Sequence, residues 1–319
     1  MILVLRALGV GDLATAVPAL RGLRAGLPGR ELVLAAPAWL APLVALTGAV
    51  DRVLPTDGPD RVAWTGPPPE LAVNLHGRGP ESHRALAAVR PARLLAYRSP
   101  EGGHPDGPVW DDDEHEVRRW CRLLHAYGLP ADPGDLALRR PAAPGVPAGV
   151  TVLHPGSKVP AKRWPADRFA GLARALTARG HRVVLTGSAD ERTLAAGVAR
   201  DAGLPPEAVL AGTTGLAELA ALVADARLVV SGDTGVAHLA TGYGTASVVL
   251  FGPVPAARWG PPADRPRHRV LGATRVVGPD RDSAGFVGVG THPTLDAIEI
   301  DEVVAAVAEV ERVSGAVAA

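Results

Sequence analysis

The chain has 319 residues, with 33 basic and 33 acidic side chains and a single cysteine. This balance of charge argues against a nucleic-acid-binding surface or a polybasic membrane patch, and one cysteine excludes a disulfide framework or a cysteine zinc cluster. The length predicts about two domains, each large enough to bury its own core. The only two lysines, Lys158 and Lys162, both lie in the segment HPGSKVPAKRWP (154–165).

The first hundred residues contain short apolar runs that predict β-strands, with helical patterns or loops between them. The runs span residues 2–5, 31–36, 51–55, 71–76 and 93–97. Arg6 and Asp12 interrupt the N-terminal apolar stretch, which also lacks a basic leader, so it predicts a strand entering a helix instead of an export signal. No apolar run reaches the roughly 18 residues of a membrane span. We therefore expect a soluble, cytoplasmic protein.

From residue 150 the same alternation starts again. Strands are predicted over 150–156, 181–188, 227–233 and 246–253, and helices over 168–180, 191–203, 216–226 and 235–244. Strands that are apolar on both faces and alternate with helices are typical of parallel, doubly wound α/β sheets. The sequence therefore predicts two α/β domains in series.

A Pro- and Gly-rich segment, RRPAAPGVPAG (139–149), separates the two series and has the composition of a linker. We predict a first domain over residues 1–143, a second over 150–300 and a final amphipathic helix over 301–319, whose docking the sequence does not define. Two such domains would enclose a cleft, because ligands of open α/β sheets bind at the carboxyl ends of the strands.

The turn after the first strand carries Gly9, Gly11 and Ala14, which fit the G-x-G-x-x-A fingerprint of dinucleotide-binding proteins. A nicotinamide-dependent oxidoreductase is therefore one alternative, although the second strand ends in LAAPAW and lacks the acidic residue that binds the ribose. The glycines also permit a tight turn that leaves Asp12 at the start of a helix. There Asp12 can cap the helix or act as a reactive group, and the sequence leaves both interpretations open.

The turn after the first strand of the second series offers a glycine amide, a hydroxyl and two ammonium groups. They belong to Gly156, Ser157, Lys158 and Lys162. Such groups suit a pyrophosphate, although their spacing differs from that of a P-loop. Lys158 can equally lie in a solvated loop. Because the chain otherwise uses arginine, a retained lysine indicates a position that favours a compact ammonium.

A third polar cluster follows the strand predicted over 227–233. Asp233, Thr234 and Gly235 lead into a helix, and His238 lies one turn beyond Thr234 on the same face. The free amides of a helix start can bind phosphate groups, and an adjacent carboxylate can bind sugar hydroxyls. Thr234 can also be a simple N-cap, and His238 a structural hydrogen-bond donor.

Five motifs, in this order and spacing, resemble those of the ADP-heptose:lipopolysaccharide heptosyltransferase family, glycosyltransferase family 9, over almost the whole chain. They are LGVGDLATAVPAL near the N-terminus, HPGSKVPAKRWP, GSADER (187–192), SGDTGVAHLA, and LFGP followed by WGP (250–261). The resemblance implies an α/β protein with the GT-B fold, in which two Rossmann-like doubly wound domains face each other across a cleft.

The resemblance also implies roles for the motif residues. Asp12 matches the family's general base, which acts on the acceptor hydroxyl. Lys162 matches the lysine that contacts the donor pyrophosphate, and Ser157 matches a hydroxyl residue on the same phosphates. Lys158 has no firm counterpart, but its place beside Ser157 makes it a further candidate for donor binding.

The remaining donor contacts implied by the resemblance lie later in the chain. Glu191 falls near an acid that holds the adenosine ribose, with Asp190 as the alternative. The donor sugar and phosphates are assigned to the family's Asp-Thr-Gly and the histidine that follows it, here Asp233, Thr234, Gly235 and His238.

The implied reaction is an inverting transfer of a sugar, heptose in this family, from a nucleotide diphosphate donor such as ADP-heptose. It needs no metal and no cofactor, and it would require cleft closure about the 139–149 linker. A nucleotide-sugar epimerase can share the two-domain architecture. That activity, the oxidoreductase and a protein that only binds its ligand are the alternatives.

Basic residues of the first domain hold an anionic acceptor in this family. This chain offers Arg6 and the segment LHGRGPESHRAL (75–86), in which His76, Arg78, Ser82 and His83 are expected near the cleft. Arg78 and His83 are the predicted acceptor-binding residues, with a solvated loop as the alternative. The acceptor itself can be a lipopolysaccharide core, another glycan, a lipid-linked glycan or a small metabolite.

The acidic segment WDDDEHEVRRW (110–120) can suggest a metal site. Its acids precede its arginines, however, and this order complements the dipole of a helix. We therefore interpret it as the first turn of a helix and predict no metal site.

Overall fold

A computed structural model describes residues 1–143, 145–272 and 290–318 of the chain. The chain divides into two units, Met1–Arg139 and Arg140–Ala319, and this division falls at the start of the Pro- and Gly-rich segment 139–149. Residues 273–289 of the predicted second domain and residue 319 of the predicted final helix lie outside the described residues.

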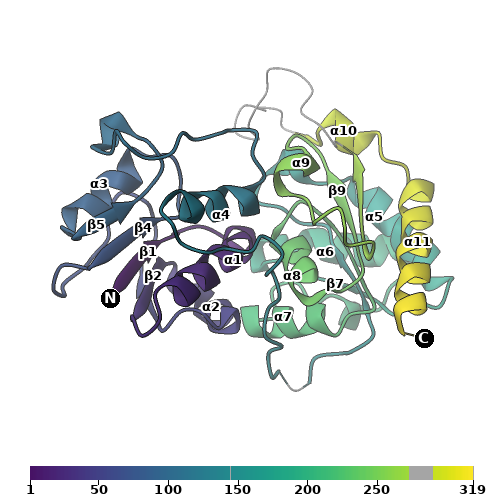
Figure 1. The fold of residues 1–319 in the computed structure, drawn as a ribbon. Helices are drawn as coiled ribbons and strands as arrows, with labels where there is room; N and C mark the ends of the chain where they lie inside the picture. Colours follow the sequence, from purple (N-terminus) through teal and green to yellow (C-terminus); the bar gives the residue numbers. More distant parts are fainter. Residues whose placement is uncertain (144, 273–289, 319) are drawn as a thin grey trace. The chain divides into compact units, whose positions relative to one another are not determined.

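The first unit is built on parallel strands in the order β3-β2-β1-β4-β5 (Figure 1). These strands are β1 (Ile2–Leu5), β2 (Leu32–Ala36), β3 (Arg52–Pro55), β4 (Leu71–Asn74) and β5 (Arg93–Leu95), and all five lie within the predicted runs. β1 and β4 are buried along their whole length, as central strands of a parallel sheet covered on both faces must be.

Helices follow the strands of the first sheet. They are α1 (Val10–Gly26), α2 (Ala41–Thr47), α3 (Glu81–Ala88) and α4 (Glu116–Ala126). α1 packs against α4 and α2, and α3 packs against β4. α1 therefore starts directly after the carboxyl end of β1, the edge at which ligands of such sheets bind.

The second unit repeats this plan with the strand order β10-β9-β8-β6-β7, again all parallel. The strands are β6 (Thr151–His154), β7 (Val183–Leu185), β8 (Leu228–Gly232), β9 (Ser247–Phe251) and β10 (His268–Gly272). The first four lie within the predicted runs. β10 was not predicted, because this edge strand is only partly buried and an exposed Arg269 breaks its apolar pattern.

Seven α-helices are described in the second unit. They are α5 (Ala166–Thr177), α6 (Arg192–Ala202), α7 (Leu216–Ala224), α8 (Gly235–Tyr243), α9 (Ala256–Trp259), α10 (Pro293–Asp296) and α11 (Ile300–Ala318). α5 to α8 match the four predicted helices within a few residues. α11, the predicted final helix, packs against α5, β9 and β10 and so belongs to the second unit.

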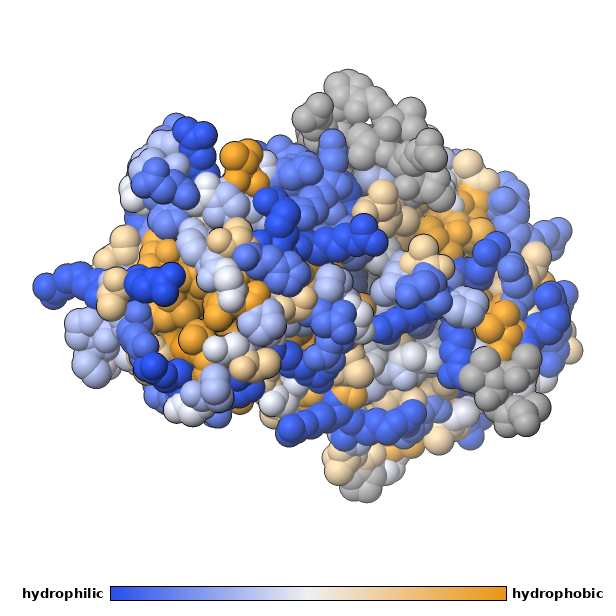
Figure 2. Space-filling view, viewed as in Figure 1, coloured by the Kyte–Doolittle hydropathy of each residue, from blue (hydrophilic) through white to orange (hydrophobic). Residues whose placement is uncertain are grey.

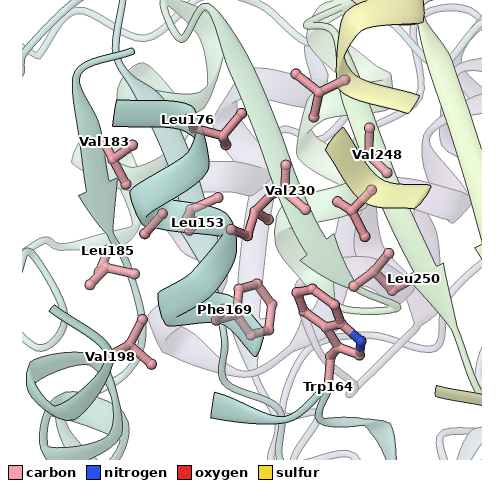
Figure 3. Close-up of a cluster of buried hydrophobic side chains, with 14 of the residues drawn as sticks. Leu153, Trp164, Phe169, Leu176, Val183, Leu185, Val198, Val230, Val248 and Leu250 are labelled. Atoms are coloured by element: carbon pink, nitrogen blue, oxygen red, sulfur yellow. The ribbon is translucent and has the colours of Figure 1, made fainter. Parts of the chain in front are cut away.

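Apolar side chains from β6 to β9 and from α5 form the core of the second unit (Figure 3). Trp164 and Phe169 meet edge to face, with ring centroids 5.0 Å apart. The Trp164 indole N–H donates to the Ile298 carbonyl at 3.0 Å. Because burying such a large side chain stabilises the fold by a few kcal/mol, Trp164 anchors the segment that carries Lys162.

The surface is mixed in character. Hydrophilic side chains cover much of the face seen in Figure 2. Among the described residues, Trp39 and Val109 are large apolar side chains that are exposed. Over the described ranges, no helix combines the length and the apolar composition that crossing a bilayer requires.

Candidate functional site

The carboxyl ends of β6 and β8 form the topological switch point of the second sheet. The chain leaves β6 toward β7 on one side and later returns to β8 on the other. The two loops therefore diverge and leave space for a ligand between them. Ser157 and Lys158 follow β6, and Asp233 and Thr234 follow β8, so the predicted donor-binding residues lie at one edge of one sheet.

Lys162 and Asp233 form an ion pair at this edge. The Lys162 Nζ lies 2.8 Å from Asp233 Oδ2, and the two side chains are 18% and 8% exposed. His238 Nε2 lies 3.8 Å from the other carboxylate oxygen, Oδ1. Burial opposes ionisation of Asp233, but His238 and Lys162 hold its pKa below the usual value. The ammonium group is thus fixed at the switch point while part of its surface stays open.

Two features of the sequence place Lys162 there. It ends the short 3-10 helix Pro160–Lys162 and is followed, two residues later, by the buried Trp164. On the other side, a Cβ at Gly232 would lie 2.9 Å from the Lys162 carbonyl oxygen. Glycine at 232 therefore allows β8 to approach this segment, so the second and fourth motifs fit together in space.

The start of α8 carries an unusual hydroxyl. Thr234 occupies the N-cap position, but its side chain makes no capping hydrogen bond. Its Oγ1 is buried and has no hydrogen-bond partner in the described part of the chain. An unpaired buried hydroxyl costs about 1–3 kcal/mol, so a simple N-cap does not account for Thr234. Together with the first amides of the helix, beginning at Gly235, the hydroxyl can donate to an anion.

The structure separates Ser157 from its neighbour Lys158. Ser157 is buried, and its Oγ accepts a hydrogen bond from the Val159 N–H at 3.3 Å. Its hydroxyl proton can therefore still be donated to a ligand. Lys158 is exposed, and no ion pair joins it to another described residue. The solvated-loop interpretation of Lys158 thus agrees with its position.

Glu191 lies against the loop that follows β6. A Cβ at Gly156 would lie only 2.2 Å from the Glu191 Cδ, so this glycine makes room for the carboxyl group. Glu191 Oε2 also accepts a hydrogen bond from the Ser188 N–H at 2.8 Å. Asp190 is exposed. Of the two acids that the sequence left open, Glu191 is therefore the one whose side chain lies at the edge of the sheet.

The first sheet has its own switch point, between β1 and β4, and Asp12 lies there in the first turn of α1. Its Oδ2 accepts a hydrogen bond from the Gly9 N–H at 3.0 Å. Asp12 is thus the third residue of the helix and reaches back to the N-cap residue, instead of being the N-cap itself. The side chain stays 28% exposed, so it caps the helix and remains accessible.

Arg6, offered by the sequence as a basic group for the acceptor, is buried instead. Its guanidinium donates to the Asp12 carbonyl at 2.6 Å, to the Thr15 hydroxyl at 3.2 Å and to Glu116 Oε1 at 3.0 Å. It also lies over the Trp120 ring, 4.9 Å from the centroid. Arg6 therefore fixes the start of α1 and the backbone of Asp12, and the expectation that it meets the acceptor was wrong.

The acidic segment 110–116 mostly precedes α4, so its interpretation as a first helical turn holds only for Glu116. Although burial opposes its ionisation, the neighbouring Arg6 and Arg119 hold the pKa of Glu116 below the usual value. Glu114 pairs with Arg122 at 2.8 Å. Among the described residues there is no group of three or more side chains that could hold a metal ion.

The two predicted acceptor residues differ in exposure. Arg78 is 64% exposed, with its Nη1 3.4 Å from the Asp112 carboxylate. His83 is buried: its Nε2–H donates to the Tyr97 carbonyl at 2.7 Å and its Nδ1 accepts from the Asn74 amide at 3.1 Å. Burial lowers the pKa of His83. Both ring nitrogens are engaged, so in this structure His83 holds the loop after β4 in place and presents no free nitrogen to a ligand.

From the sequence, His76 was expected near the cleft but was given no role, and Asn74 was not singled out; both organise this switch point. The Asn74 amide donates to the Ser82 hydroxyl at 2.9 Å, and its Oδ1 accepts from the His76 N–H at 3.0 Å. His76 Nδ1 in turn accepts from the Ala7 N–H at 3.2 Å. One signal was available: Asn74 is the only asparagine in 319 residues, as conspicuous as the two lysines.

Two doubly wound parallel sheets, each with polar side chains gathered at its switch point, define an α/β protein of the GT-B class. The sequence profile of glycosyltransferase family 9 (heptosyltransferase) matches residues 109–282, more than half of the chain. The chain belongs to this family, and the resemblance noted in its motifs is confirmed.

Relatives of known function and structure agree with this membership. The chain is 34% identical over 119 residues to lipopolysaccharide heptosyltransferase 3 of Escherichia coli, in a match that covers 37% of this chain and only 35% of that protein. The structure of E. coli ADP-heptose lipopolysaccharide heptosyltransferase II is similar, with a TM-score of 0.77 and 23% identity over 98% of this chain and 99% of that one. The family 9 glycosyltransferase of Veillonella parvula DSM 2008 gives a TM-score of 0.80 at 20% identity, over 97% and 96% of the two chains. The structural likeness confirms the predicted GT-B fold.

Proposed function

We propose that the protein transfers a heptose from ADP-heptose to an acceptor hydroxyl, with inversion at the anomeric carbon. One observation carries the proposal: the Lys162–Asp233 ion pair lies at the same switch point as the unpartnered Thr234 hydroxyl. A cation, a hydroxyl and the free amides of a helix start together suit a pyrophosphate. Membership of family 9 and the donor named for the E. coli structural relative support ADP-heptose.

In this proposal the second unit binds the donor. Lys162, Thr234 and the first amides of α8 hold the pyrophosphate, and Ser157 donates its hydroxyl proton to the same group. Glu191, at the carboxyl edge of the sheet, accepts hydrogen bonds from the ribose. Asp233, with His238 beside it, orients the ammonium of Lys162 and binds sugar hydroxyls.

The first unit supplies the base. Asp12 takes the proton of the acceptor hydroxyl as the acceptor oxygen attacks the anomeric carbon, and ADP leaves from the opposite face of the sugar. General base catalysis contributes about 10²–10⁴ in rate. Negative charge grows on the leaving pyrophosphate, where Lys162 and the Thr234 hydroxyl stabilise it.

We propose a glycan, a lipid-linked glycan or a small metabolite as the acceptor. Arg78, in the loop after β4, is 64% exposed and so open to an anionic acceptor. The lipopolysaccharide named for the E. coli relative is the first acceptor to test, because it is the one that a sequence relative of this chain is named for.

The dinucleotide alternative fits the first unit poorly. In a nicotinamide enzyme the pyrophosphate would occupy the start of α1. Here the Asp12 carboxylate already accepts the hydrogen bond of the Gly9 N–H at that position, and a second anion beside it would be repelled.

The substitution Asp12→Asn tests the proposal. Asparagine keeps an oxygen that can accept from Gly9 but cannot take a proton from the acceptor, so we expect transfer to fall by at least about 100-fold. ADP affinity should stay unchanged. The assay follows ADP release from ADP-heptose with lipopolysaccharide from an E. coli strain that lacks heptosyltransferase 3, and NMR of the product gives its anomeric configuration.

Four results would contradict the proposal in different ways. Near-normal turnover of Asp12→Asn would exclude Asp12 as the base. Retention of the donor's anomeric configuration would exclude an inverting mechanism. An isomerised sugar formed from ADP-heptose without acceptor would identify an epimerase, and quenching of nicotinamide fluorescence on binding would identify an oxidoreductase.

A further inference from the structure

His76 is held in one tautomer by a backbone hydrogen bond. The Ala7 N–H donates to its Nδ1 at 3.2 Å, so Nδ1 carries a lone pair and the ring proton of the neutral imidazole is on Nε2. Ala7 follows β1 and His76 follows β4. The ring therefore spans the two central strands at the switch point where Asp12 lies.

The backbone of His76 is held in place as well. The His76 N–H donates to Asn74 Oδ1 at 3.0 Å, and Asn74 is buried and bonded to Ser82 at 2.9 Å. A side chain held at its backbone and at one ring nitrogen has little freedom to turn. The direction of the Nε2–H is therefore set by the fold.

The Nε2–H has no protein partner in the described part of the chain, although the side chain is partly exposed. The Arg6 guanidinium donates both to the Asp12 carbonyl and to the carbonyl of Leu75, the residue before His76, while no ion pair joins the Asp12 and His76 side chains in the described structure. A donor and a carboxylate thus lie near each other without touching. A ligand group that accepts a hydrogen bond from His76 and donates one to Asp12 would join them.

A hydroxyl is such a group, because its oxygen has two lone pairs and one proton. We propose that His76 is an acceptor-binding residue whose Nε2–H donates to the oxygen of the attacking hydroxyl, turning the hydroxyl proton toward Asp12. This inference rests on the proposed function. The hydroxyl proton passes to Asp12, the acceptor oxygen bonds to the anomeric carbon, and the bond from that carbon to the phosphate oxygen breaks. His76 gives up no proton.

The electrostatic surroundings of the ring agree with this role. Burial, reinforced by the positive Arg6, lowers the pKa of His76 to about 4, with Asp12 opposing the shift. Above that pH the ring is neutral, its Nδ1 is occupied by Ala7 and its Nε2 carries the proton. His76 therefore cannot act as the general base, which leaves that step to Asp12.

Two amide substitutions test the roles of the two ring nitrogens separately. In His76→Asn the side-chain oxygen can replace Nδ1 and still accept from Ala7, but nothing donates from the place of Nε2. In His76→Gln the amide reaches the place of Nε2 and can donate there. We expect His76→Asn to raise the KM for truncated E. coli lipopolysaccharide or lower kcat, with a combined loss of about 10-fold in kcat/KM for that acceptor. His76→Gln should recover part of that loss.

Affinity for ADP, measured by calorimetry, should be unchanged in both variants, because the donor residues belong to the other unit. His125→Asn, the same change at an exposed histidine of the same unit, is the matched control and should behave as wild type. If His76→Asn lowers the melting temperature, His76→Gln and His76→Leu are compared instead, because only glutamine carries a hydrogen-bond donor at the place of Nε2.

The outcomes distinguish this inference from the proposed function. Wild-type protein that releases no ADP from ADP-heptose contradicts both. Active wild-type protein with an unchanged acceptor KM and kcat in His76→Asn contradicts the role of His76 alone. Equal losses in His76→Gln and His76→Leu would also overturn it, because the donor at Nε2 would then have no effect.

Discussion

At the scale of single residues, the two lysines make an internal comparison. Lys162 is paired with Asp233 at the switch point, whereas Lys158 is exposed four residues earlier in the chain. A charge-assisted hydrogen bond to phosphate is worth about 1.5–3 kcal/mol, so Lys162→Ala should weaken ADP binding by roughly 10- to 150-fold. Lys158→Ala, the matched control, should change ADP affinity by less than about 3-fold. Isothermal titration calorimetry measures both.

The control for folding uses the same two variants. Lys162→Ala leaves the carboxylate of Asp233 without its ammonium partner, and a buried charge without a partner destabilises a fold, so its thermal unfolding should be recorded beside ADP affinity. A folded Lys162→Ala protein that binds ADP as wild type does would show that the pyrophosphate lies elsewhere. Weaker binding in Lys158→Ala alone would reverse the roles of the two residues.

Some residues of the site can be predicted from a local sequence pattern, and others cannot. Asp12, Lys162 and Asp233 follow strand ends or glycine turns, so a local pattern places them at the carboxyl edge of a sheet. Arg6 and His83 depend on partners that no local pattern reveals. Arg6 is paired with Glu116, 110 positions away, and the His83 ring bonds to the carbonyl of Tyr97 on a separate segment. A polar side chain that the sequence suggests is exposed can be buried when a residue distant in the chain provides its hydrogen-bond partner.

At the scale of elements, buried strands are easier to predict than edge strands. β6, β8 and β9 are mostly apolar and buried at every position. β10 pairs with β9 at the edge of the described sheet and has only one buried residue, with Arg269 exposed, so its run resembles a loop. The extent of the helices was predicted well because their apolar faces repeat every three to four residues. The start of α4 was not, since its acids bind arginines instead of capping the helix.

The start of α8 gives a prediction in which stability and binding change in opposite directions. Thr234→Val keeps the shape of the side chain and removes the buried hydroxyl that has no protein partner. Without ligand, the free energy of unfolding should stay equal or rise by up to about 1 kcal/mol, because an unpaired polar group is lost. ADP affinity should fall by about 10-fold, because one hydrogen bond to the pyrophosphate is lost. Ser157→Ala, in the loop after β6, removes a second hydroxyl for comparison. A Thr234→Val protein that is less stable but binds ADP normally would show that the Thr234 hydroxyl has a structural role.

At the scale of the whole molecule, the two units repeat one plan with different chemistry at the switch point. The first places a carboxylate and a neutral histidine there, and the second places a cation, a hydroxyl and a helix start. The first set suits a hydroxyl that must lose a proton, and the second suits a diphosphate that must leave with its charge. In the proposed function, the first unit therefore takes the acceptor's proton and the second unit holds the leaving diphosphate.

If the two units are independent, a substitution in the first unit should change the unfolding of that unit alone. In the first unit, Glu116→Gln removes the carboxylate between Arg6 and Arg119 and should cost about 3–5 kcal/mol of unfolding free energy at pH 7. The folded-state pKa of Glu116 lies below its ordinary value of 4.5, so the carboxylate stabilises fully above pH 4.5 and less as the pH falls through the folded-state pKa. The difference between wild type and variant should therefore shrink in acid. Glu114→Gln, which loses only the partly exposed pair with Arg122, should cost about 1 kcal/mol or less.

ADP should stabilise the second unit against unfolding and leave the first unit unchanged. At a concentration 100 times its Kd, a ligand that binds only the folded state adds about 2.7 kcal/mol, and this gain should appear in the unfolding of residues 140–319. Differential scanning calorimetry of the full chain can resolve the two effects: Glu116→Gln should lower one transition, and ADP should raise another that Glu116→Gln leaves in place. If both instead moved one shared transition, the two units would unfold together, and their two switch points would be coupled through the fold before any substrate binds. The separate responses are expected because each unit has its own parallel sheet.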